Sequence, residues 1–134
     1  MLHQYLTRLY ATVHSRGEIK VEHFDATQRT SLRGHVAGHL RFYDGSLLAF
    51  EEILEVRGVH QITKTYYKYH YQRADGTLVF RYDNAPHHPE VPTFPDHIHT
   101  EGCVEAATPP DLSDVLRKID ELLYPLGRGE GSNG

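Results

Sequence analysis

Several features that would restrict the class of this protein are absent from its sequence. The single cysteine, Cys103, excludes an internal disulfide and fits a reducing compartment. No apolar run approaches the roughly 18 residues that a membrane span needs. The N-terminus also lacks the basic start and apolar stretch of a secretion signal. We therefore expect a cytoplasmic protein with no membrane segment.

A strong positive charge is absent as well, and this limits how tightly the chain could bind nucleic acid. The formal net charge is -4. Residues 1–82 carry 11 Lys and Arg against 8 Asp and Glu (+3), whereas residues 83–134 carry 3 against 10 (-7). This asymmetry permits a mildly basic surface that would hold RNA only weakly. Charge neither establishes nor excludes an RNA partner.

The length and the hydrophobic content predict a single domain. A chain of 134 residues with 39% hydrophobic residues can bury a core of its own. We place this domain at residues 1–126. Residues 127–134 contain too much glycine to pack and are predicted to form a disordered tail.

Hydrophobic periodicity predicts an α+β fold. Apolar residues recur at helical spacing over residues 2–14 and again after residue 111, so a helix is expected at each end of the domain. Thr108, followed by two prolines, is the predicted cap of the second helix. Between the helices, glycine-punctuated β-rich segments predict an antiparallel β-meander of about four to six strands.

The pair Asp44-Gly45 predicts the first of two hairpins. A three-residue loop at residues 44–46 would place apolar residues on one face of the two strands. On the other face it would pair His39 with Glu51 and His35 with Glu55. We expect these pairs to be structural.

The pair Asp75-Gly76 predicts the second hairpin. A two-residue turn here would set His70 opposite Arg81 and Lys68 opposite Asp83 on one side of the sheet. Proton-transfer groups and charges would then lie together on that side. The other side is predicted to be aromatic core, made of Tyr69, Tyr71, Phe80 and Tyr82.

The segment from Arg81 to His99 is rich in proline and histidine. Its prolines recur every third residue, which is the period of a polyproline II helix, so the segment after the strand is predicted to be an extended surface strap. Histidine can give and take a proton near neutral pH, and it is also a common metal ligand. The strap could thus hold imidazoles in place for chemistry. Its histidines are His87, His88, His97 and His99.

Four strings of residues in this region resemble the TumE family of small toxins. They are Tyr69-His70-Tyr71-Gln72, Ala74-Asp75-Gly76, Arg81-Tyr82-Asp83-Asn84-Ala85-Pro86-His87-His88-Pro89-Glu90 and Thr93-Phe94-Pro95. The resemblance covers roughly residues 30–120 of the chain. It implies the toxin half of a two-gene toxin–antitoxin module, with an antitoxin encoded nearby as the partner. It assigns no catalytic residues, so their roles are inferred from chemistry.

The residues favour a metal-independent endoribonuclease. In that reaction a base deprotonates a ribose 2′-OH, the oxygen attacks phosphorus, an acid protonates the leaving 5′-oxygen, and a cation stabilises the phosphorane. Arg81 would supply the cation, His70 with His87 or His88 would move protons, and Asp83 would orient an imidazole. No cofactor is predicted. The candidate substrate-binding residues are Lys68, Tyr66 and Asn84.

Three other interpretations stay open at this point. The first is a zinc shell of His88, Glu90, His97 and His99, although a polyproline period would set His88 and His97 on one side and His87 and His99 on another. In the second, a non-catalytic toxin would dock a partner through the strap. In the third, Arg81 and Asp83 form only ion pairs across the strands and have no catalytic role. The sequence leaves homo-oligomerisation and the RNA target open.

Overall fold

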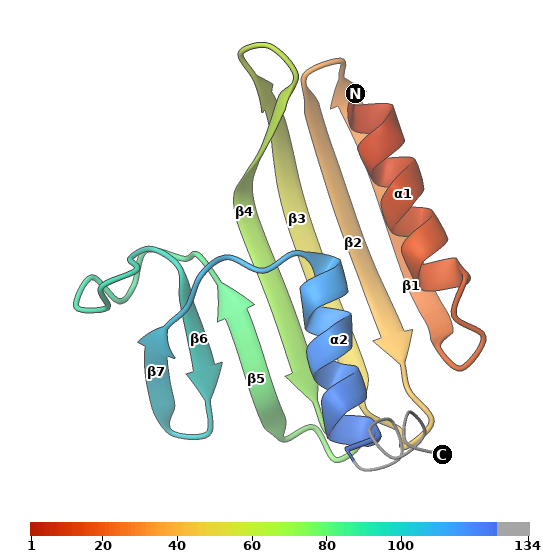
Figure 1. Ribbon diagram of the computed structural model, residues 1–134, viewed down its shortest axis with the longest axis vertical. Helices are drawn as coiled ribbons and strands as arrows, with labels where there is room; N and C mark the ends of the chain where they lie inside the picture. The colour runs from red at the N-terminus through yellow and green to blue at the C-terminus, as the bar shows by residue number, and fades with distance from the viewer. Residues whose placement is uncertain (126–134) are drawn as a thin grey trace, which may run out of the picture.

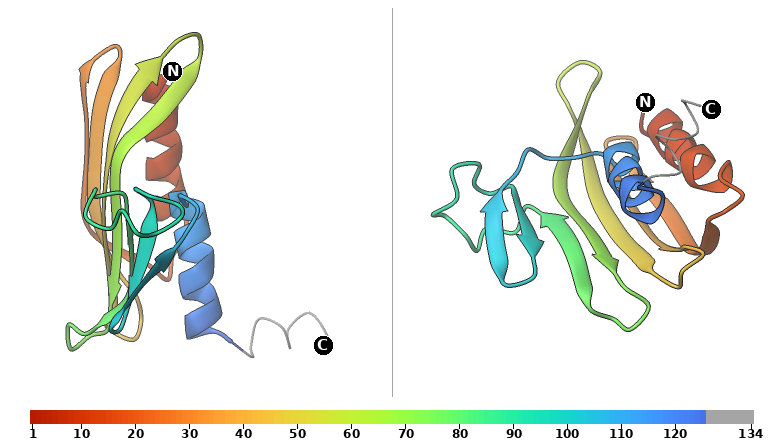
Figure 2. Two further views of the ribbon diagram at one scale, coloured as in Figure 1. Left: turned by 90° about the vertical axis from the view of Figure 1, so that its left-hand side faces the viewer. Right: turned by 60° about the horizontal axis from the view of Figure 1, so that its bottom comes forward.

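The computed structural model describes residues 1–125, which form an α+β domain built on one antiparallel sheet. Successive strands lie side by side in chain order, and both helices cover the same side of the sheet (Figures 1 and 2). The predicted meander with a helix at each end is confirmed. The elements are α1 (Leu2–His14), β1 (Lys20–Thr30), β2 (Arg33–Arg41), β3 (Leu47–Arg57), β4 (Gln61–Gln72), β5 (Leu78–Asp83), β6 (His97–Thr100), β7 (Cys103–Ala106) and α2 (Leu112–Leu123).

The sheet in the described part of the chain has seven strands, more than the four to six expected. The additional pair is β6 and β7, a hairpin of two four-residue strands. Strands this short contain too few alternating positions to give a clear periodic signal. The predicted tail at residues 127–134 lies outside the described residues. In the described part, neither helix has the length and apolarity needed to cross a lipid bilayer.

The C-terminal helix begins later than its sequence suggested. Asp111, and not Thr108, is the N-cap: its side chain accepts a hydrogen bond from the Asp114 N–H, and Asp114 accepts one from the Asp111 N–H. This reciprocal capping box satisfies two backbone donors that a Thr108 cap would leave open. The N-terminal helix has the predicted bounds and buries one apolar stripe: Leu2, Leu6, Leu9 and Val13.

The first hairpin has a register two residues away from the predicted one. Its three-residue loop is residues 43–45, because the N–H of Phe42 donates to the carbonyl of Ser46. Gly45 then occupies the last loop position with φ of 85°, a conformation that favours glycine there. A shift of two residues keeps every side chain on its predicted face. It does change the partners, and His35 bonds Glu51 at 2.6 Å instead of facing Glu55.

The second hairpin has the predicted register but not the predicted turn. Its loop is the three residues 74–76, closed by a hydrogen bond from the Arg73 N–H to the Thr77 carbonyl. Val79 forms a bulge with no partner in β4, and this extra residue restores the register that the longer loop would have displaced. His70 therefore pairs with Arg81, as predicted.

The core lies between the sheet and the two helices. Tyr69, Tyr71 and Phe80 are buried there as predicted, while Tyr82 is only partly buried. The core also holds a buried carboxylate, Glu52, which accepts hydrogen bonds from the hydroxyls of Tyr5 and Tyr69. Other buried core residues include Val36, Leu40, Leu48, Phe50, Leu54, Tyr67, Leu112, Val115, Leu116 and Ile119.

A bulge in β4 completes this buried polar group. Thr65 has no partner in β3, so Lys64 points to the same side of the sheet as Glu52. The Lys64 ammonium lies 3.8 Å from the Glu52 carboxylate and donates to the Tyr69 hydroxyl and the Pro110 carbonyl. Burial lowers the pKa of Lys64, and the charge of Glu52 opposes this effect. These contacts compensate for burying both charges.

The prediction of an extended polyproline strap is wrong. Residues 84–96 form a series of tight turns, closed by backbone hydrogen bonds from His87 to Ala85 and from Val91 to His88, and by two more near residue 94. A polyproline II helix has no such internal bonds. The turns shorten the segment and bring His88 back against the histidines of β6.

Candidate functional site

The two helices cover one face of the sheet (Figure 2). On the opposite face polar side chains lie in straight rows, because the strand register aligns one residue from each strand. Within a row, side chains on adjacent strands are about 5 Å apart at Cβ. Proton-transfer and charged groups from distant parts of the chain therefore become neighbours. One row runs His23, His39, Ala49, His70, Arg81, His99 and Val104, and the next runs Asp25, Ala37, Glu51, Lys68, Asp83, His97 and Ala106.

Asp83 is the centre of the cluster at the β5–β6 end of these rows. Its buried carboxylate accepts hydrogen bonds from Arg81 Nε at 3.0 Å and from the Ala85 N–H at 3.0 Å. It also lies 2.9 Å from His97 Nε2 and 3.5 Å from His99 Nε2. One carboxylate thus contacts a guanidinium and two imidazoles and can orient all three.

His97 is the most enclosed of these imidazoles, with a relative exposure of 1%. Its Nδ1 lies 2.8 Å from the Pro95 carbonyl, and its Nε2 lies 2.9 Å from Asp83. Both neighbours are acceptors, so the ring can hydrogen-bond to both only as the doubly protonated imidazolium. In that form His97 would place a fixed positive charge at the floor of the cluster.

His88 reaches the same cluster from the turn-rich segment. Its ring centroid lies 5.0 Å from that of His97 and 5.3 Å from that of His99. Its Nδ1 faces Glu90 at 3.3 Å. The polyproline period had separated His99 from His88, and this prediction is wrong because the turns fold His88 over both β6 histidines.

Arg81 lies between two histidines in its row. His70 is its partner on β4, and His99 is its partner on β6. Burial lowers the pKa of His70, the contact with Gln72 raises it, and the charges of Arg81 and Lys68 lower it further. Together these effects favour the neutral form of His70.

The pKa of His99 is lowered for similar reasons. Burial has the largest effect, and the charge of Arg81 acts in the same direction. The Asp83 carboxylate opposes both, because it favours the protonated ring. His99 thus has a carboxylate partner for its charged form, whereas the side chain of His70 contacts the amide of Gln72.

The other predicted site residues are distributed unevenly around this cluster. Lys68 lies in the row of Asp83, and Tyr66 lies one row further along the same face of β4. His87 is exposed, and it is His88 that joins the imidazole cluster. Asn84 has a structural role, since its amide accepts from the Tyr67 N–H and donates to the Thr65 carbonyl.

Sequence reasoning underestimated His97 and His99, which it treated only as alternative metal ligands. Their His-x-His spacing places both on one face of a strand. What the sequence did not reveal is that this strand pairs with β5, so that the two rings face Asp83 and Arg81. The strand is only four residues long and follows several prolines, which concealed it.

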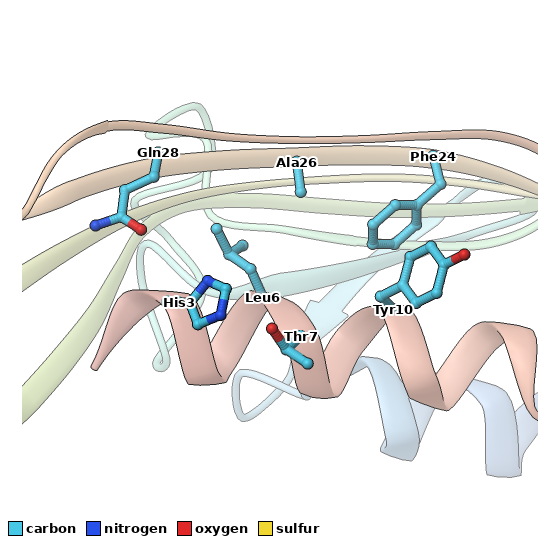
Figure 3. A pocket seen from close by; sticks show the side chains of 7 residues that line it. All are labelled: His3, Leu6, Thr7, Tyr10, Phe24, Ala26 and Gln28. Carbon is cyan, nitrogen blue, oxygen red and sulfur yellow. The ribbon is translucent and has the colours of Figure 1, made fainter.

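A separate pocket lies at the other edge of the sheet, between α1 and β1. Figure 3 shows side chains of the helix facing side chains of the strand across it. The strand order places this pocket at the edge opposite β6 and β7. It lacks the convergent imidazoles and the guanidinium of the other end, so we do not assign the chemistry to it. The lining residues are His3, Leu6, Thr7, Tyr10, Phe24, Ala26 and Gln28.

Comparison with known families defines the class of this protein as a toxin of a toxin–antitoxin system. The model of the family described as Toxin TumE matches residues 7–123. The chain belongs to the TumE toxin family, and a cognate antitoxin is its expected partner. The match begins within α1 and extends over the sheet to the end of α2. No curated protein and no solved structure matches the chain significantly.

Proposed function

We propose that this toxin is a metal-independent endoribonuclease whose active site is the row His70, Arg81 and His99. The observation that carries the proposal is that three adjacent strands place a guanidinium between two imidazoles. Adjacent strands are about 4.8 Å apart, so the two histidine backbones are separated by about 10 Å. A phosphodiester over Arg81 would then have a proton carrier on each side.

Each group has a role that follows from its environment. His70, whose pKa is lowered, acts as the base that deprotonates the ribose 2′-OH. His99, whose protonated form faces Asp83, protonates the leaving 5′-oxygen. Arg81 stabilises the charge on the phosphorane oxygens. The products are an RNA with a 2′,3′-cyclic phosphate and one with a 5′-hydroxyl.

Neighbouring residues would support the reaction without taking part in it. Asp83 holds the Arg81 side chain through the 3.0 Å contact and keeps the ring of His99 oriented. Lys68, which pairs with Asp83 across the strands, adds positive charge beside the phosphate. Tyr66, one row away on β4, is placed to stack on a base of a single strand.

The test is cleavage of an end-labelled single-stranded RNA by the purified protein in excess EDTA. We expect products with a 2′,3′-cyclic phosphate end. His70→Ala and His99→Ala should each reduce the rate about 10²–10⁴-fold, the usual contribution of acid–base groups. His39→Ala is the matched control, because His39 lies in the same row but three strands from Arg81 on β5.

Two results would contradict this proposal. One is intact RNA after long incubation with protein that arrests growth when expressed. The other is full cleavage by folded His70→Ala and His99→Ala proteins, which would indicate a contaminating nuclease. Growth arrest that persists in both variants and is relieved by the antitoxin would instead support a toxin that acts by docking.

A further inference from the structure

We propose that His97, His99, His88 and Asp83 form a binding site for a divalent transition metal of the zinc type. Three imidazoles converge here, with one ligand atom of each within 4.8 Å of the others. Nothing else in the described residues brings three histidines so close together. The site includes residues of the proposed nuclease, so a bound metal and the acid form of His99 would exclude each other.

The contacts of His97 orient its ring so that Nε2 faces the other donors. Its Nδ1 donates to the Pro95 carbonyl, which leaves the Nε2 lone pair free in the neutral ring. That lone pair faces the buried carboxylate of Asp83 at 2.9 Å. A lone pair and a carboxylate at this distance repel unless a positive charge lies between them. A proton can fill this position, and so can a metal ion.

The donor distances suit one coordination shell. Two ligands that are each about 2.0–2.2 Å from a tetrahedral zinc are separated by roughly 3.3 Å. One carboxylate oxygen of Asp83, Oδ1, lies 2.9 Å from His97 Nε2, and the other, Oδ2, lies 3.5 Å from His99 Nε2. These three donors therefore need only small shifts, and His88, the more exposed ring, would complete the set by a side-chain movement.

Groups around the donors resemble the outer partners of metal ligands. A ligating histidine normally donates its other N–H to a carboxylate or a backbone carbonyl. The Pro95 carbonyl has this role for His97, and Glu90, 3.3 Å from Nδ1, is placed to have it for His88. Asp83 thus replaces Glu90 as the carboxylate ligand considered from the sequence, because Asp83 is buried at the centre and Glu90 is exposed.

The chemistry of the donors selects the metal. Imidazoles favour Zn²⁺, Co²⁺, Ni²⁺ and Cu²⁺ over Mg²⁺ and Ca²⁺, which prefer all-oxygen shells. The Arg81 guanidinium also contacts Asp83, and this positive charge opposes a divalent ion. We therefore expect a site of moderate affinity that exchanges its metal, and not a permanent structural centre.

The experiment uses the untagged chain after treatment with a chelator. Titration with Zn²⁺ in a calorimeter should give one ion per chain, and Co²⁺ should give the visible bands of a tetrahedral nitrogen-ligated ion. His99→Ala and His88→Ala should each weaken Zn²⁺ binding at least about tenfold, in line with the cost of removing even an outer-shell partner. His87→Ala, one residue from His88, is the matched control and should bind like the wild type.

Three results would overturn the proposal: no stoichiometric binding of Zn²⁺, unchanged affinity in folded His88→Ala and His99→Ala proteins, or an equal loss in His87→Ala. Binding is measured without RNA, so it does not depend on nuclease activity. If the protein cleaves RNA, Zn²⁺ should inhibit cleavage over the same concentration range in which it binds. Inactive protein that binds Zn²⁺ would refute the nuclease and leave the metal site in place.

Discussion

At the scale of single residues, the site depends on one carboxylate that contacts several cationic or protonatable side chains. Asp83 contacts Arg81, His97 and His99 at 3.5 Å or less. His97 is enclosed and charged when both of its hydrogen bonds are made, while His99 is more exposed and can exchange protons with a substrate. Burial and partners thereby give two chemically similar imidazole neighbours different roles.

The pH dependence of RNA cleavage follows from these residues. A general base must be neutral and a general acid must be protonated. Burial lowers the pKa of both His70 and His99 below the usual value for imidazole. The rate should therefore peak on the acid side of neutrality and fall as the pH rises, because His99 loses its proton.

The measurement is kcat/KM on a short RNA from pH 5 to pH 8.5 at constant ionic strength. The charged and titratable groups that act on His99 are Arg81, Asp83, His97 and His88. Asp83→Asn removes the carboxylate that favours the protonated ring and should move the alkaline limb to lower pH. A rate that rises continuously to pH 8.5 would contradict the assignment of His99 as the acid.

At the scale of secondary-structure elements, turns and bulges decide which side chains meet. The Val79 bulge corrects the register after a three-residue loop, and it thereby places His70 beside Arg81. The Thr65 bulge turns Lys64 toward the buried Glu52. Each of these β-bulges inserts one residue into a strand and thereby changes the side of the sheet to which the following or preceding side chains point.

The cap of α2 provides a stability test at this scale. Asp111→Ala removes a side chain that bonds the Asp114 N–H at 2.7 Å, and it should reduce the free energy of unfolding by about 1 kcal/mol. Thr108→Ala is the control, since the exposed Thr108 is not the cap. Urea denaturation of the two variants gives the comparison. A greater loss in Thr108→Ala would mean that the helix begins earlier than in the structure.

The elements show why part of the fold could be read from the sequence. The bounds of α1, the faces of both hairpins and the aromatic core follow from local periodicity, which survives a register shift of two residues. Local periodicity did not predict the turns of residues 84–96, the N-cap of α2 or the hairpin β6–β7. A three-residue proline period is compatible with turns as well as with an extended chain, and four-residue strands have little pattern of their own.

At the scale of the whole molecule, the two helices cover one side of the sheet (Figure 2). The strand register places the site on the other side. The chain as a whole has a formal net charge of -4. Near the site, Lys68 and Arg81 are the cations on the strands β4 and β5 that face this side. Few phosphates can therefore be neutralised when RNA binds.

This arrangement predicts weak RNA binding with a shallow salt dependence. For single strands the slope of log K against log salt is about -0.7 for each phosphate neutralised. Two cations thus imply a slope of about -1.4. Fluorescence anisotropy of labelled RNA with the His99→Ala protein, at several salt concentrations, provides the measurement. A slope steeper than about -4 would require a larger basic surface than this face offers.

The sequence alone determined the fold class, the two helices, the polar and apolar faces of the strands and the TumE resemblance, because each depends on local patterns. It also predicted the candidate site residues His70, Arg81, Asp83, His87 and His88, a prediction that the RNA-cleavage assay tests. Only the tertiary structure decided that His97 and His99 share their site, since that contact joins β6 to β5 across a turn-rich segment. Pairing between strands and the path of irregular chain depend on packing of the whole domain, and local composition carries little record of either.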